Sequence, residues 1–118
     1  MVELLYMPEF SAWFDGLTEQ EQATVQVSLR RLQQEGLSLG WPHSSSIKGS
    51  RHALRELRPK QGRSPLRPFY VFDPRRNAVL LTGGDKAGDN RFYDRIVPIA
   101  DAIIDRHLAD LKRRPKGG

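Results

Sequence analysis

Three short stretches separated by turn-rich connectors constrain the fold of this 118-residue chain more than any other feature. Residues 53–57 alternate apolar and charged side chains, residues 66–72 (LRPFYVF) are aromatic and β-branched, and residues 78–83 (AVLLTG) are almost wholly apolar. The connectors RPKQGRSP and DPRRN carry the Pro, Gly and Asn that are typical of hairpin turns. The pattern therefore predicts an antiparallel meander of three strands.

The N-terminal part predicts one further strand and two helices. Residues 2–7 (VELLYM) are a short apolar run suited to a strand, and the following PEFSAWFDGL places three aromatic residues at helical spacing. Thr18 and Glu21 have the spacing of a capping box, which marks the start of a second helix, and Gly36 marks its end.

The remaining segments predict a loop and a last helix. Residues 37–50 carry Gly, Pro and three serines, which indicates a connecting loop. A last amphipathic helix begins near Asn90 or Asp94, and Pro98 implies either a kink or a start around residues 96–98. The resulting order β-α-α-β-β-β-α belongs to the α+β class, with about four antiparallel strands. We expect one domain over residues 1–112 and a basic, flexible tail over residues 113–118.

Positive charge is concentrated in the middle of the chain. Residues 1–40 hold two Lys or Arg against six acids (−4), residues 41–76 hold nine against two (+7), and residues 77–118 hold eight against six (+2). A basic middle suggests a surface that faces a polyanion, although a solvated basic face is equally compatible with the charge alone.

Several classes of protein are disfavoured. No cysteine is available for disulfides or thiolate ligands, and the three histidines lack metal-ligand spacing, so we expect no metal and no cofactor. GGDKAGD lacks the Gly-Lys-Ser/Thr ending of a phosphate-binding P-loop, and no nucleophile elbow surrounds the serines near His43. Since no apolar run approaches the ~18 residues of a membrane span, we expect a cytoplasmic protein with no membrane partner.

Several arginines fall on the predicted sheet. Arg55 or Arg58 is expected to meet Arg67 on one concave face, with Lys86 arriving from the end of the third strand. Guanidinium groups gathered on one surface repel one another unless an anion binds there, and Arg offers planar bidentate contacts to phosphate. The alternative reading, arginines that only solubilise the surface, stays open.

Four motifs carry a family resemblance over roughly residues 47–108: LRELR, LRPFYVF, LLTGGDK and IADAIIDRHL. They resemble strands and the C-terminal helix of the RelE/ParE toxin superfamily, in particular its HigB or phage Gp49-like branch. The chain departs from that branch at Gly84-Asp85-Lys86-Ala87, where relatives carry an aromatic residue before paired lysines. It also departs at Pro68, which removes a donor from its strand.

The resemblance implies the toxin half of a type II toxin–antitoxin pair, and specifically a ribosome-dependent mRNA interferase. Such an endoribonuclease needs no metal, because a 2′-hydroxyl attacks the adjacent phosphate, the 5′-oxygen leaves, and a cyclic phosphate results. The implied partners are the ribosome, mRNA and a cognate antitoxin, expected to be a helix-turn-helix protein of HigA type.

The resemblance also implies roles for particular residues. Arg67 is expected on the scissile phosphate with Lys86 assisting, Tyr93 is expected to stack on a base or handle a proton, and Arg91 to bind a backbone phosphate or the leaving oxygen. RNA or ribosome contact is expected from Lys48, Arg55 and Arg58.

The general base is left open, as is the choice among three functions. His52 is the nearest histidine, and the alternatives are two aspartates that could equally cap a turn, Asp85 and Asp89. Two other functions compete with RNA cleavage: a gyrase-directed toxin of ParE type, and a non-catalytic nucleic-acid-binding accessory protein. Replacing Arg67 by Ala is expected to remove toxicity and to leave the protein folded.

Overall fold

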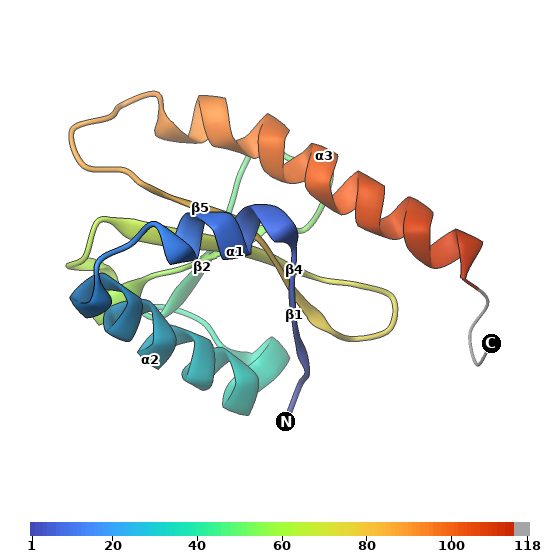
Figure 1. Ribbon diagram of the computed structural model, residues 1–118, viewed down its shortest axis with the longest axis horizontal. Helices are drawn as coiled ribbons and strands as arrows, with labels where there is room; N and C mark the ends of the chain where they lie inside the picture. Colours follow the sequence, from blue (N-terminus) through green and yellow to red (C-terminus); the bar gives the residue numbers. More distant parts are fainter. Residues whose placement is uncertain (115–118) are drawn as a thin grey trace.

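The computed structural model describes residues 1–114 of the chain (Figure 1). Its elements in chain order are β1 (Leu4–Tyr6), α1 (Pro8–Asp15), α2 (Glu19–Glu35), the 3-10 turn η1 (Gly36–Ser38), β2 (Ser44–Ser46), β3 (Arg55–Leu57), the 3-10 turn η2 (Pro59–Gly62), β4 (Leu66–Phe72), β5 (Ala78–Asp85) and α3 (Phe92–Arg113). The predicted α+β class is confirmed. Most of the expected tail, residues 115–118, lies outside the described residues.

The sheet has five strands in the order β1-β5-β4-β3-β2. Strands β3, β4 and β5 form the predicted antiparallel meander. Two details differ from prediction: β1 pairs with β5 in parallel, and β2 lies within the expected loop and pairs antiparallel with β3. Serine has little preference for strands, so β2 depends on its pairing and on the buried Ser44 hydroxyl, which lies 2.6 Å from the Tyr70 hydroxyl.

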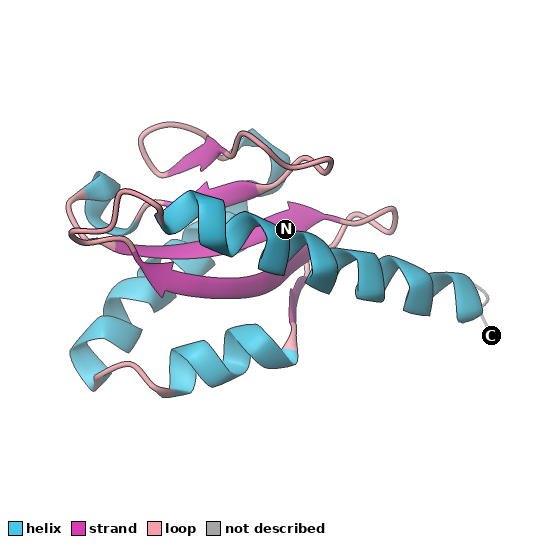
Figure 2. Ribbon diagram, turned by 90° about the horizontal axis from the view of Figure 1, so that it is seen from above, coloured by secondary structure: helices cyan, strands magenta, loops and turns pink. Residues whose placement is uncertain are grey.

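Helices cover both faces of the sheet (Figures 1 and 2). Helix α2 begins with the predicted capping box, in which Thr18 and Glu21 exchange hydrogen bonds. Together α1 and α2 bury one core against one face of the sheet, made by Phe10, Val25, Leu29, Leu32, Leu57, Leu66, Tyr70, Ala78 and Leu80 among others. Helix α3 buries a second core against the other face, made by Leu54, Val71, Val79, Leu81, Val97, Ala100, Ile103 and Ile104.

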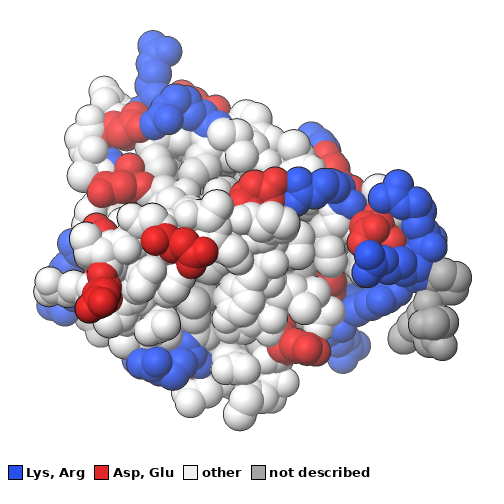
Figure 3. Space-filling model, in the orientation of Figure 1, with Lys and Arg blue, Asp and Glu red and all other residues white. Residues whose placement is uncertain are grey.

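Helix α3 starts at Phe92, and Pro98 lies inside it, so a start at residues 96–98 is wrong. Its C-terminal half extends past the edge of the sheet (Figures 1 and 2). Lys and Arg side chains gather at this end (Figure 3), including the exposed Lys112, Arg113 and Arg114. Within residues 1–114, no helix has the length and apolar character needed to cross a membrane.

Two adjacent glycines sit in strand β5, where they allow large aromatic side chains to approach both faces of the sheet. A Cβ on Gly83 would overlap the ring of Trp13 from α1, and a Cβ on Gly84 would lie 2.7 Å from a ring carbon of Phe92 in α3. The predicted strand ended at Gly83, whereas β5 continues through Gly84 to Asp85, and close packing rather than turn geometry requires the two glycines.

Replacing Gly83 by Ala is expected to lower the free energy of unfolding by about 1–3 kcal/mol, because the rigid Trp13 ring must move to admit the methyl group. Urea denaturation monitored by circular dichroism measures the change. Gly40→Ala is the matched control, since a Cβ there meets nothing within 4 Å and the backbone is unstrained. Equal stability of the two variants would contradict this account of Gly83.

Candidate active site

A cluster of charged and polar side chains lies on the α3 face of the sheet, and a carboxylate is at its centre. We call it the Glu56 cluster; its other members are Tyr93, Ser45, Arg58 and Arg67. Glu56 in β3 is only 4 % exposed. One of its oxygens accepts a hydrogen bond from the Tyr93 hydroxyl (2.7 Å), and the other accepts one from the Ser45 hydroxyl (2.8 Å). The Arg67 Nε lies 3.7 Å from Oε1 and an Arg58 nitrogen lies 3.8 Å from Oε2. Two hydroxyls therefore orient the carboxylate and two guanidinium groups balance its charge.

The elements that meet here explain how the cluster forms. Glu56 pairs with Phe69 across the β3–β4 ladder, and Arg67 stands two residues before Phe69 on the same face. Tyr93 belongs to the first turn of α3, so it reaches the sheet where the helix begins to cover it. Its ring packs edge-on against Phe69, with 6.3 Å between the centroids.

Arg67 is almost fully enclosed, with 1 % of its surface exposed. Its terminal nitrogens donate to the carbonyl oxygens of Ser64, Leu66 (2.8 Å) and Gly62 (3.4 Å), and its buried Nε makes no hydrogen bond. The sequence led us to expect this guanidinium on an open surface. Its β4 position instead turns it beneath the η2 loop, where backbone carbonyls rather than solvent satisfy it.

Tyr93 is held in its neutral form. Burial, the hydrogen bond to Glu56 and the negative charge of that carboxylate raise the pKa of Tyr93 to about 12, partly offset by the positive charge of Arg67. The Lys86 ammonium lies 5.8 Å from the centre of the Tyr93 ring, within range of a cation–π interaction. The phenol is thus a hydrogen-bond donor at physiological pH.

A pocket of about 530 Å³ gives solvent access to this cluster. It is lined by Ser46, Ile47, Lys48, Gly49, Glu56, Tyr93 and Asp94. A neighbouring pocket of about 460 Å³ continues along α3 and shares Lys48, Gly49, Tyr93 and Asp94. The exposed Lys48 therefore stands at the mouth of a site whose floor is a buried carboxylate.

The family model described as "Phage derived protein Gp49-like" matches residues 12–105. The chain belongs to the Gp49-like family. This confirms the branch to which the sequence motifs pointed. No solved structure matches the chain.

Two curated relatives of this Gp49-like protein come from Mycobacterium tuberculosis (strain ATCC 25618 / H37Rv). One, described as a candidate toxin and named HigB2, is 40% identical over 110 residues, covering 90% of this chain and 55% of its own length. The other, described likewise and named HigB3, is 38% identical over 108 residues, covering 90% of this chain and 93% of its own length. The chain thus spans about half the length of HigB2 and nearly all of HigB3.

The structure brings together four of the residues singled out in the sequence of this Gp49-like protein. Arg58 and Arg67 approach Glu56, Tyr93 bonds to it, and Lys86 lies over the Tyr93 ring. Lys48 lines the same pocket.

The other two predicted residues lie apart from the cluster. Arg55 is on the α1/α2 face, where its Nε donates to the Ser44 and Tyr70 hydroxyls, so of the two predicted alternatives it is Arg58 that shares the Glu56 carboxylate with Arg67. Period-two alternation along β3 explains this, because Arg55 and Glu56 must point to opposite faces. Arg91 is exposed just before α3 and forms no ion pair within residues 1–114.

The three residues considered as general bases are engaged elsewhere. His52 lies 2.8 Å from an Asp105 oxygen on α3. Asp85 accepts from the Ala87 amide and Asp89 from the Arg91 amide, which are turn-capping contacts.

Sequence reasoning missed Glu56 as a site residue. The signal was present, because Glu56 and Asp73 are the only acids among residues 41–76, where nine Lys or Arg occur. An acid on an alternating strand, within a strongly basic segment, is a candidate for a buried counter-charge. Among residues 1–114, no three His, Asp or Glu side chains are grouped as ligands for a metal ion.

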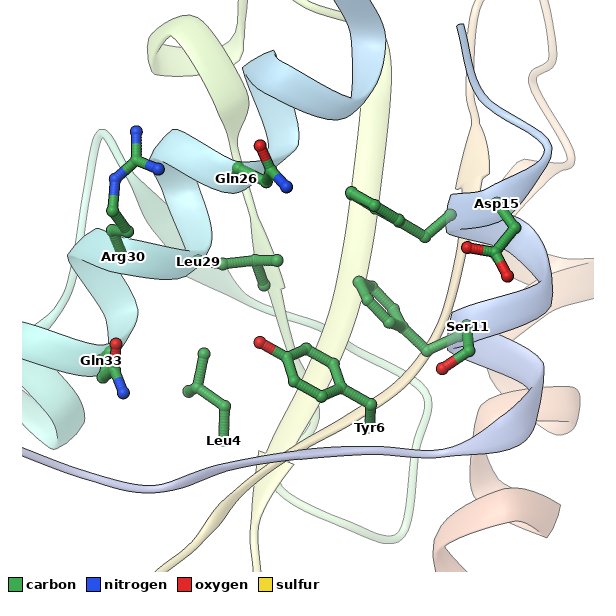
Figure 4. A pocket seen from close by; sticks show the side chains of 10 residues that line it. Leu4, Tyr6, Ser11, Asp15, Gln26, Leu29, Arg30 and Gln33 are labelled. Atoms are coloured by element: carbon green, nitrogen blue, oxygen red, sulfur yellow. The ribbon is translucent and has the colours of Figure 1, made fainter. Parts of the chain in front are cut away.

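A further pocket of about 460 Å³ lies on the opposite side of the sheet, between α1 and α2 (Figure 4). Leu4, Tyr6 and Leu29 point into it, and its charged lining residues are Asp15 and Arg30. Its Tyr6 phenol, Asp15 carboxylate and Arg30 guanidinium form no hydrogen bond or ion pair with one another within residues 1–114, in contrast to the groups of the Glu56 cluster. We therefore assign the candidate chemistry to the α3 face.

The Tyr93 phenol is expected to have a pKa of about 12 rather than 10, because burial disfavours its phenolate and that phenolate would stand against the Glu56 carboxylate. The raised pKa means that the neutral phenol favours the folded state. Its contribution to stability is therefore complete below pH 10 and is lost as pH rises from about 10 to 12. Ultraviolet titration of the protein minus that of a Tyr93→Phe variant isolates this phenol. A difference curve centred at pH 10 would contradict the buried contact with Glu56.

Proposed function

We propose that this protein is the toxin of a toxin–antitoxin pair and that it is an endoribonuclease acting at the Glu56 cluster. Its relatives HigB2 and HigB3 are described as candidate toxins, which supports the first part. The single observation that supports the second part is the buried Glu56 carboxylate at the floor of a pocket that Lys48 also lines, bonded to a neutral phenol and flanked by two arginines.

In this proposal Glu56 is the general base. The carboxylate accepts the proton of an RNA 2′-hydroxyl, whose oxygen then forms a bond to the adjacent phosphorus. Arg67 remains behind the carboxylate, where its Nε lies 3.7 Å from Oε1 and its backbone contacts fix the site. This assigns Arg67 a positioning role rather than the direct phosphate contact expected from the family resemblance.

Positive charge for the phosphate comes from side chains that reach solvent. Lys48 and Lys86 stand at the pocket mouth and over Tyr93, and Arg58 lies beside Glu56. They can offset the extra negative charge that develops on phosphorus in the transition state. We assign Arg91, which is exposed before α3, to a neighbouring backbone phosphate, and Arg55 has no part in the proposal.

Tyr93 supplies the proton that the leaving group needs. As the bond between phosphorus and the 5′-oxygen breaks, that oxygen takes the phenol proton, and Glu56 returns its own proton to the phenolate across their 2.7 Å contact. Protons balance, and the products are a 2′,3′-cyclic phosphate and a 5′-hydroxyl end. The side chains named here complete this cycle.

Two partners belong to the proposal. The substrate is mRNA on the ribosome, in the cytoplasm, and the cognate antitoxin is a helix-turn-helix protein that covers the pocket above Glu56. Purified protein added to free mRNA and to ribosome-bound mRNA tests the first point, since only the bound message is expected to be cut.

Induced expression in a bacterial host followed by mapping of RNA ends tests the function. We expect growth arrest and codon-linked cuts in translated mRNA that carry cyclic phosphate and 5′-hydroxyl ends. DNA damage without RNA cuts would instead support a gyrase-directed toxin. Absence of growth arrest would rule out both toxin functions.

A further inference from the structure

Trp41 presents a large aromatic surface to solvent beside the candidate active site. Its side chain is 72% exposed, and one face of the ring is covered by the Arg58 guanidinium, whose central carbon lies 4.1 Å from the ring centre. An exposed indole that already holds a cation on one face leaves the other face available for stacking.

The same guanidinium connects Trp41 to Glu56. Arg58 is 15% exposed, its Nε donates to the Pro42 carbonyl at 3.2 Å, and another nitrogen lies 3.8 Å from a Glu56 oxygen. Gly62 closes over this guanidinium at a φ of +90°, where a side chain would overlap it. Arg58 therefore cannot swing away easily, so Trp41 stays one side chain away from the carboxylate.

We infer that Trp41 stacks on a base of single-stranded RNA next to the nucleotide whose 2′-hydroxyl faces Glu56. This rests on the proposed function for the identity of the ligand. A single-stranded chain offers unstacked bases to an aromatic platform while its phosphates follow the neighbouring cations. Every base has a π face, so Trp41 adds affinity without selecting a sequence.

The charges around Trp41 favour RNA over a protein as the ligand of this platform. Lys60 and Arg63 are exposed in and just after the η2 turn, whose Gly62 packs on Arg58. An indole stacked on Arg58, which itself packs on a turn with two exposed cations, matches the alternating bases and phosphates of a nucleic-acid strand better than an apolar protein surface.

A non-cleavable probe separates binding from chemistry. We use a single-stranded RNA octamer with 2′-O-methyl groups, which block the attacking hydroxyl, and measure its affinity and the quenching of tryptophan fluorescence. Trp41→Ala is expected to weaken binding about tenfold, and Trp41→Phe, which keeps a stacking ring, to weaken it less than about threefold. The Trp41→Phe variant retains only Trp13, so it is expected to lose most of the quenching.

Leu37→Ala is the matched control, because Leu37 is 75% exposed and lies only four residues before Trp41. It is expected to bind the octamer like the unaltered protein. Unchanged affinity or quenching in Trp41→Ala would overturn the inference. So would a Trp41→Ala protein that binds the octamer normally but escapes neutralisation by the antitoxin, since Trp41 would then belong to a protein interface.

The two proposals fail separately. If the induced protein cuts no RNA in cells while the octamer still quenches Trp41, the cleavage proposal falls and the stacking site stands. If RNA is cut in cells and the Trp41→Ala variant binds and cuts as well as the unaltered protein, only the stacking site falls.

Discussion

Replacing Glu56 by Gln is expected to reduce RNA cleavage about 100-fold or more, because the amide cannot accept the 2′-hydroxyl proton. Gln keeps the size of the side chain and an oxygen that can accept from Tyr93 or Ser45. Loss of activity would then reflect loss of the base rather than of the surrounding contacts. Single-turnover cleavage on programmed ribosomes measures the rate, and growth after induction provides a second readout.

Glu3→Gln is the control for this experiment, since Glu3 is an exposed glutamate just before β1, which is separated from β3 by two strands of the sheet. It is expected to cleave and arrest growth normally. Both variants need thermal unfolding curves, because Glu56→Gln also removes the counter-charge of the buried Arg67. A folded Glu56→Gln protein that cleaves within about threefold of the unaltered rate would show that Glu56 is not the base.

The elements that the sequence predicted well are those fixed by local interactions. The capping box of α2 depends only on Thr18 and Glu21, and strand β4 has the predicted bounds because its last four residues, FYVF, are all aromatic or β-branched. In contrast, β2 consists of three serines and exists only through its pairing with β3, and the parallel pairing of β1 with β5 joins the two halves of the chain. Neither strand pairing can be recognised from the residues next to it in the sequence.

The candidate site was also only partly predictable, because its contacts join segments that are far apart in the sequence. Alternation correctly separates the two faces of β3, so it places Arg55 with Leu57 and Glu56 with Leu54. Alternation gives the direction of a side chain but not how deeply it is buried. The sequence therefore predicts an exposed Arg67. In the structure, the segment that includes η2 covers it, and strand alternation carries no information about that segment. The glutamate that neutralises it comes from another strand, and cross-strand register decides that partnership.

Replacing Arg67 by Ala is expected to lower the free energy of unfolding by about 3–5 kcal/mol, because Glu56 would keep a buried charge with one flanking cation lost. The carbonyl oxygens of Ser64, Leu66 and Gly62 would lose their donor as well. The earlier expectation that this variant stays folded while losing toxicity is therefore revised. Denaturant unfolding measures the change.

A surface arginine provides the control for this large effect. Arg106 pairs with Glu9 through two hydrogen bonds, yet it is half exposed, so Arg106→Ala is expected to cost less than about 1 kcal/mol. If Arg67→Ala costs as little, the buried network is not what stabilises this end of the sheet.

The double variant Arg67→Ala with Glu56→Gln separates charge from packing. Since it removes both charges, it is expected to be more stable than the sum of the single changes predicts, by about 0.5–3 kcal/mol. Strict additivity would mean that the 3.7 Å approach of the two groups carries no coupling. A stable Arg67→Ala protein that no longer cleaves RNA would contradict the positioning role of Arg67. Arg67 would then act directly on the phosphate, and the guanidinium would have to leave its three carbonyl partners when RNA binds.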